Sequence, residues 1–150
     1  MAEYIKIGVD ALEAELRKRT PALLDARSLT PFVNFRRANT RGMQNLPTCW
    51  VTPGANTIAE EGQALTEQAM VTVTIGLDGA DPDKLVNDGI AYVAAVTDAL
   101  ESVADWGDLI THVHPVHQDY SAKFRLENGF AIFPSVAVEV HFTELPVTTS

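Results

Sequence analysis

Apolar residues in this chain recur at two spacings, one typical of helices and one typical of strands. In residues 2–19, four apolar side chains lie four, three and four positions apart: Ile5, Val9, Leu12 and Leu16. This spacing predicts a helix with a single apolar face. Basic residues at its end and Pro21 just beyond it predict that the helix stops after residue 19.

A second helix is predicted over residues 81–103. Asp81 is suited to cap it, and Pro82 then occupies the first helical position, where a missing N–H costs nothing. The predicted apolar face comprises Val86, Ile90, Val93, Thr97 and Leu100, widened by Leu85, Gly89 and Val96. We expect this face to pack on a sheet.

Alternation of apolar and polar residues predicts the strands. It is clear in residues 70–75 and 136–142, where every second residue is apolar. Residues 46–51 and 109–116 also favour strands, and a short apolar patch at residues 32–35 is a further candidate.

A hairpin is predicted near the C-terminus. Residues 123–126 and 130–133 flank Glu127-Asn128-Gly129, and Asn-Gly is a strong turn signal because both residues tolerate positive φ. Pro134 should interrupt the ladder before the last strand.

Two long connections interrupt these elements. Residues 25–45 are turn-prone and basic, and residues 52–68 are polar, with Pro53-Gly54 typical of a turn. Loops of this length are usually functional or disordered. The pattern as a whole predicts one α+β domain over residues 1–150. Its mainly antiparallel or mixed sheet would pack against two helices, with long loops and a C-terminal β-hairpin.

The charge of the chain is divided unevenly. Residues 1–41 hold eight of the eleven Lys and Arg residues and five acids, a balance of about +3, whereas residues 42–150 hold three bases and fifteen acids, about −12. The acidic body argues against tight wrapping of nucleic acid, because phosphate attraction is missing over most of the chain. A basic end and an acidic body can instead pair between copies in an oligomer.

No motif of a known catalyst interrupts the pattern. His112 and His114 share a face if residues 109–116 form a strand, and they are the candidates for a metal site, while His117 would point the other way. Asp105 and Asp108 are the candidate acid/base pair. The sequence favours neither the metal site nor this catalytic pair. The single Cys49 lies in an apolar run, which favours a buried structural thiol. We therefore expect no catalytic residue, no metal and no cofactor.

The order of elements resembles the tail terminator, or tail completion, proteins of long-tailed bacteriophages. The similarity includes the helix at 2–19, the strand at 46–51 with Pro53 after it, the long loop, the strand at 70–75 and the capped helix from Asp81. It continues through the C-terminal hairpin to the alternating strand at 136–142 and covers most of the chain. The basic segment Arg36–Arg41 has no counterpart in the family.

The resemblance implies a virion protein of the tail or neck, assembled in the host cytoplasm. It would form a ring, typically a hexamer, that caps the tail tube protein, ends tube growth and meets the head connector or neck protein. Phage DNA would pass through without specific binding, and no membrane is involved. Candidate interface residues are those of the basic segment and the long polar connection: Arg36, Arg37, Arg41, Glu60 and Glu61.

Three alternatives stay open at this point. One is a head completion or neck adaptor protein, which has similar size and elements. The second is a tube terminator of a non-viral contractile injection particle. The third is a metal-dependent enzyme that uses the histidine cluster.

Overall fold

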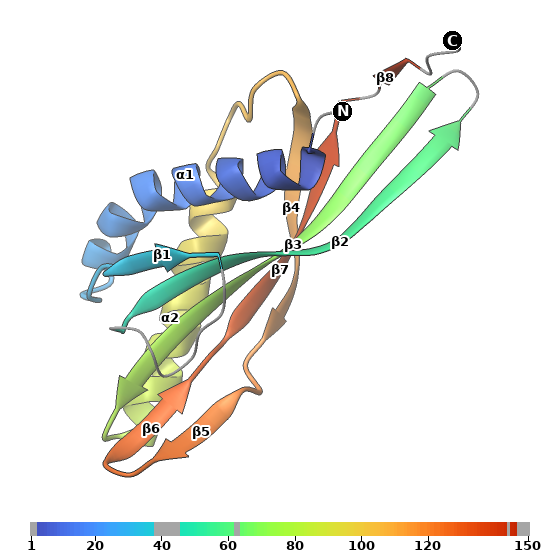
Figure 1. Cartoon of the computed structure of the whole chain (residues 1–150). Coiled ribbons are helices and arrows are strands. Elements are labelled where there is room, and N and C mark those ends of the chain that lie inside the picture. Colours follow the sequence, from blue (N-terminus) through green and yellow to red (C-terminus); the bar gives the residue numbers. More distant parts are fainter. Residues whose placement is uncertain (1–2, 38–45, 62–63, 144, 147–150) are drawn as a thin grey trace.

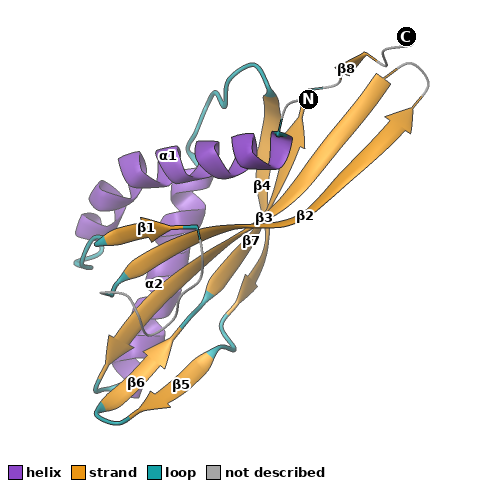
Figure 2. Ribbon diagram, in the orientation of Figure 1, coloured by secondary structure: helices purple, strands orange, loops and turns teal. Residues whose placement is uncertain are grey.

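A computed structural model describes residues 3–37, 46–61, 64–143 and 145–146. In this part of the chain, two helices cover one face of a mixed sheet (Figures 1 and 2). The elements are α1 (Tyr4–Ala26), β1 (Asn34–Arg36), β2 (Thr48–Glu61), β3 (Ala64–Gly79), α2 (Pro82–Glu101), β4 (Ile110–Asp119), β5 (Lys123–Leu126), β6 (Gly129–Ile132), β7 (Ser135–Phe142) and β8 (Leu145–Pro146). The predicted α+β class and mixed sheet are confirmed.

The long strand β3 organises the sheet. It pairs with β2 along one side, and along the other side it pairs in succession with β8, β7 and β6. β4 lies outside β7, β5 lies outside β6, and the parallel strand β1 lies outside β2. Among the described strands, β1, β4, β5 and β8 each pair with one neighbour and are therefore edges of the sheet.

The core lies between the sheet and both helices. The alternation predicted for the last strand is confirmed, because Val136, Val138, Val140 and Phe142 of β7 are buried while the residues between them are half-buried. The aliphatic side chains of β2 and β3 join the same cluster as the inner faces of α1 and α2. The opposite face of the sheet carries the polar half of the alternation.

Helix α1 is longer than the sequence predicts. It passes through Pro21 and ends at Ala26, so the predicted stop after residue 19 is wrong. Leu24 is fully buried in the core, and the buried Thr20 hydroxyl donates a hydrogen bond to the carbonyl of Leu16. Packing of residues 20–26, about two further turns, outweighs the hydrogen bond that a proline removes.

Helix α2 begins as predicted, but its buried face is rotated. Asp81 accepts hydrogen bonds from the N–H groups of Asp83 and Lys84, which confirms the cap. Ile90, predicted to face the core, is 49% exposed, whereas Tyr92 is buried. The Tyr92 hydroxyl donates to the carbonyl of Thr30. Tertiary contact with the segment before β1 therefore decides the orientation of this helix.

The predicted long loop at residues 52–68 is wrong, because β2 and β3 continue as one hairpin. Pairs run from Asn56↔Ala69 to Glu61↔Ala64, and this part projects beyond the helices as an arm (Figure 1). The Pro53-Gly54 pair marks a bulge inside β2, since the register shifts between Pro53 and Asn56. A Cβ on Gly54 would lie 2.7 Å from the carbonyl oxygen of Met70, so glycine permits this close approach.

The C-terminal hairpin is confirmed. β5 and β6 pair across the predicted turn, and β6 ends before Pro134. The strand β3 continues to Gly79, because Leu77 to Gly79 pair with β6. Trp50, on the outer sheet face, is buried in a second small cluster with Ala131 and Phe133.

Candidate assembly surfaces

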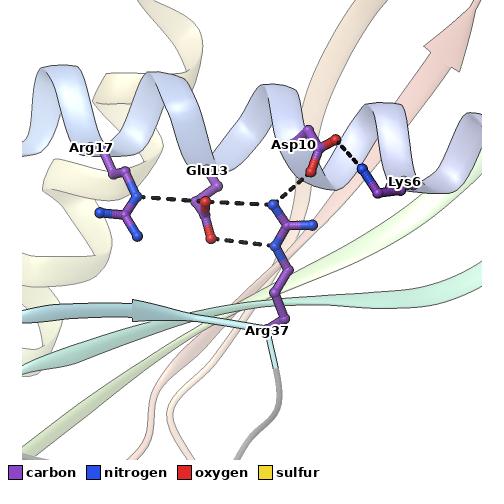
Figure 3. A network of polar contacts seen from close by, with 5 residues as sticks. All are labelled: Lys6, Asp10, Glu13, Arg17 and Arg37. Atoms are coloured by element: carbon purple, nitrogen blue, oxygen red, sulfur yellow. Dashed lines mark hydrogen bonds and ion pairs between the residues drawn. The ribbon is translucent and has the colours of Figure 1, made fainter.

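Arg37, directly after β1, contacts α1 through a network of charged side chains (Figure 3). Nη2 of Arg37 lies 2.6 Å from Oδ1 of Asp10, and its Nε donates to Oε1 of Glu13 at 3.3 Å. Lys6 adds a contact to Asp10, and Arg17 adds one to Glu13. Arg37 lies between the two acids of the helix, so cations and anions alternate along the network in the order Lys6, Asp10, Arg37, Glu13 and Arg17.

The network shifts the pKa values of Asp10 and Arg37. Hydrogen bonds from Lys6 and then from Arg37 lower the pKa of Asp10. The pKa of Arg37 is raised, mainly by its hydrogen bond to Glu13 and to a lesser extent by its hydrogen bond to Asp10. Arg17 also lies over the ring of Phe35, 4.9 Å from its centre. Arg37 therefore has partners within its own chain, whereas a role for it between subunits stays a prediction.

The other predicted interface residues lie in two places. Arg36 is exposed at the end of the edge strand β1. Arg41 lies outside the described residues. Glu60 and Glu61 end β2, where they pair with Leu65 and Ala64. The structure therefore moves these two acids from a loop to the end of the arm.

The arm carries an exposed apolar side chain that no other part of the described chain buries. Ile58 is 59% exposed, and Asn56 and Thr57 beside it are exposed as well. Only the two residues of β8 pair with β3 near the end of the arm, so the arm is close to a two-stranded ribbon, which is only marginally stable by itself in water. The arm is therefore a candidate for contact with another molecule.

A second surface surrounds the edge strand β5. All four residues of β5 are exposed, with Lys123 and Arg125 alternating with Phe124 and Leu126. Between this hairpin and the start of α2 lies a groove of about 430 Å³, lined by Leu85, Val86, Phe130 and Ile132 among others. Lys123 and Arg125 are the only Lys or Arg residues after Lys84 in the sequence. An exposed strand edge with this composition can pair with an acidic partner.

The structure brings the two predicted histidines together with one that the sequence did not indicate. His112 and His114 lie on β4, and His141 of β7 is opposite His112 in the register. The alternation of residues 136–142 already placed His141 and Glu139 on the polar face. The sequence did not indicate that β7 pairs with β4, and this pairing is what brings His141 to the other two histidines. His117 is also on β4, opposite Ala137.

The remaining polar candidates have structural roles. The Asp105 carboxylate accepts a hydrogen bond from the N–H of Gly107, and the Asp108 carbonyl accepts one from Thr143. As the side chains lie, no three His, Cys, Asp or Glu groups within the described residues form a metal-binding group. Neither described helix combines the length and apolarity needed to cross a membrane.

Cys49 is fully buried in the core, as predicted, and this has a consequence for its reactivity. Burial raises the pKa of its thiol, and the thiolate is the form that reacts. We expect iodoacetamide to leave Cys49 unmodified in the native protein and to modify it in denaturant, as measured by intact mass. Rapid labelling without denaturant would contradict this burial.

Comparison with known proteins shows which solved structures share this fold. No protein-family model matches the chain, and a search of curated proteins finds no matching sequence. Among solved structures, the chain is similar to one from the virion of a native gene transfer agent (GTA) particle, with a TM-score of 0.57 and 14% identity. The match covers 89% of this chain and 92% of that chain. At this identity the likeness establishes a shared fold over nearly the full length of both chains.

Proposed function

We propose that this chain is a structural protein of a phage-like virion that caps the tail tube as a ring. In this role it ends tube growth and forms the joint to the head connector. The observation that carries the proposal is the fold shared, over nearly the whole of both chains, with a chain of a virion particle. The order of elements that resembles tail terminators supports the same function.

Two surfaces are suited to contacts between subunits. The arm of β2 and β3 extends from one part of the molecule, and the basic edge strand β5 lies at the opposite end (Figure 1). A contact between two different surfaces repeats from subunit to subunit, and it closes into a ring when the rotation permits. We propose a homohexamer in which the arm contacts the neighbouring subunit.

The charge of the chain fits a tube through which DNA passes. The formal net charge is −9, and most of the acids belong to residues 42–150. An acidic wall repels phosphate, so DNA would slide through without specific binding. The partners in this proposal are the tail tube protein and the head connector, in a virion assembled in the host cytoplasm.

Shortening the arm tests the proposal. Replacing residues 58–67 by a two-residue Asn-Gly turn connects Thr57 to Gln68, shortens the projecting ribbon and leaves the buried Ala69 and the pairs Cys49↔Ile75 and Val51↔Val73 in place. We expect this variant to fold with the far-ultraviolet circular dichroism of a mixed α/β protein, but to lose the capping of purified tail tubes seen by negative-stain electron microscopy. Capping at wild-type tube length by the shortened protein would contradict the role of the arm.

Arg36 and Arg37 require different tests, because Arg36 is an exposed side chain at a sheet edge and Arg37 contacts acids of α1. Arg36→Glu changes an exposed side chain at a sheet edge, so the free energy of unfolding should stay within about 0.5 kcal/mol of wild type. If Arg36 contacts a neighbour or the tube, capping should weaken, and high salt should weaken wild-type capping in the same way.

The matched variant is Arg37→Gln, which removes the contacts to Asp10 and Glu13. It should lower the stability of the isolated chain by about 0–1 kcal/mol per pair. Normal capping by Arg36→Glu would assign Arg36 to solvated surface. Binding to isolated head connector without any binding to tubes would favour a neck adaptor instead.

A further inference from the structure

Three of the four histidines in the chain gather on the outer face of the sheet, away from both helices. The ring centres of His112 and His114 are 4.6 Å apart, those of His112 and His141 are 4.7 Å apart, and those of His114 and His141 are 5.9 Å apart. Two of the rings come from β4 and one from β7. The cluster therefore exists only because these two strands pair.

The register explains why all three rings share a face. His112 and His114 are two residues apart in β4, on either side of the buried Val113. In β7, Glu139 and His141 lie on either side of the buried Val140. His112 pairs with His141, and His114 pairs with Glu139, which places all four side chains on the outer face.

The sequence alone led us to expect no metal, but from the pairing of β4 with β7 we propose that His112, His114 and His141 bind a divalent transition-metal ion of the Zn²⁺, Ni²⁺ or Co²⁺ type. Imidazole nitrogens are preferred ligands of these ions. Two nitrogens bound at about 2.0–2.1 Å to one tetrahedral ion lie roughly 3.3 Å apart, which places their ring centres about 5 Å apart. The observed separations of 4.6, 4.7 and 5.9 Å bracket that spacing.

The site is formed by rotation of side chains and is not preformed. Within the described residues the rings as they lie do not converge on a metal position, so binding requires them to turn. His112 and His114 are exposed and His141 is half-buried, which leaves room for that rotation. The strand pairing holds the three Cα atoms, so the loss of freedom on binding is confined to side chains.

Glu139 has a supporting role at this site. Its Oε1 contacts Nε2 of His141, and both side chains are about three-quarters buried, with 25% and 29% exposed. A carboxylate bonded to a ligating imidazole orients the ring and increases its basicity. The neighbouring residues of β3, Gln68 opposite His141 and Met70 opposite Glu139, add no charge. Glu139 is thus a positioning residue for His141.

The ion would link the two strands at this edge of the sheet. β4 pairs only with β7 within the described sheet, and its ladder is interrupted by two register shifts. Ligands from both strands would hold them together and stabilise the native state, because the unfolded chain has no assembled site. This inference does not depend on the ring, since it concerns the isolated chain.

The test uses untagged protein, purified without a metal column and stripped with chelator. Calorimetric titration with ZnCl₂ at neutral pH should show one ion per chain, and the midpoint of thermal unfolding should rise with Zn²⁺. The effect should vanish at acid pH, because protons compete for the imidazole nitrogens. His141→Ala should reduce affinity more than tenfold, and Glu139→Gln should reduce it by about 10–100-fold.

The control is His117→Ala, which removes an exposed histidine from the same strand outside the cluster. It should retain wild-type affinity and stoichiometry. Circular dichroism of each variant without metal establishes that it is folded, and His114→Gln provides a second ligand variant with little change in volume. No stoichiometric Zn²⁺ binding by the wild type would overturn the proposal. Equal loss in His117→Ala and His141→Ala would also overturn it, because binding would then be nonspecific.

Discussion

Val93→Asp is expected to prevent the chain from folding. Val93 lies in the middle of α2 and is fully buried against the sheet. Loss of the apolar side chain costs roughly 1.5–3 kcal/mol. The side chains of the core cluster around position 93 are apolar, and a buried carboxylate among them costs several kcal/mol more. The total approaches the whole stability of a typical domain, about 5–15 kcal/mol.

The measurement is the soluble yield together with circular dichroism of any soluble fraction. Ile90→Asp is the matched control, because Ile90 lies three residues earlier on the same helix but is 49% exposed. Its effect on the free energy of unfolding should be small, and the protein should remain soluble. A folded Val93→Asp protein, or an insoluble Ile90→Asp protein, would show that the buried face of α2 is assigned incorrectly.

Gly76→Ala is expected to destabilise the protein by about 1–3 kcal/mol through overpacking. A Cβ at this position would lie 2.5 Å from Cζ3 and 2.7 Å from Cη2 of Trp50, with Leu46 Cδ2 at 3.0 Å. The indole cannot move aside easily, because it is fully buried and packed against Phe133. The midpoint of thermal unfolding should fall by about 2–4 °C per kcal/mol.

Gly8→Ala is the same chemical change, but we expect it to increase the stability of the protein. Gly8 lies in α1, and a Cβ there would meet Phe142 at 3.4 Å, an ordinary contact. Alanine should stabilise the helix by about 0.5–1 kcal/mol. Thermal unfolding followed by circular dichroism compares the two variants directly. Equal stability of Gly76→Ala and wild type would mean that Trp50 does not cover Gly76 as the structure places it.

The sequence by itself determined most elements with strong local signals. Asp81 and Pro82 define the start of α2, and Asn128-Gly129 defines the C-terminal hairpin, because capping and turn preferences depend on neighbouring residues alone. The alternation of residues 136–142 identified the buried side of β7 for the same reason. These signals were enough to predict the α+β class.

Local signals failed where a long-range contact outweighed them. The burial of Leu24 carries α1 through Pro21, and the contact of Tyr92 with Thr30 rotates the buried face of α2. The arm was missed because its exposed residues, such as Ile58, lack the alternation that burial of one face imposes on a strand. Pairing between β2 and β3 supplies the structure there.

For the candidate sites, too, the sequence predicted local placement and the tertiary structure decided which residues meet. The sequence placed His112 and His114 on one face of a strand and placed His141 on the polar side of another. Only the tertiary structure decided that these strands are neighbours, in the register that pairs His112 with His141. It also decided that Arg37 lies against Asp10 and Glu13 on α1. Residue spacing within a segment is fixed by local geometry, whereas the pairing of distant segments depends on the packing of the whole core.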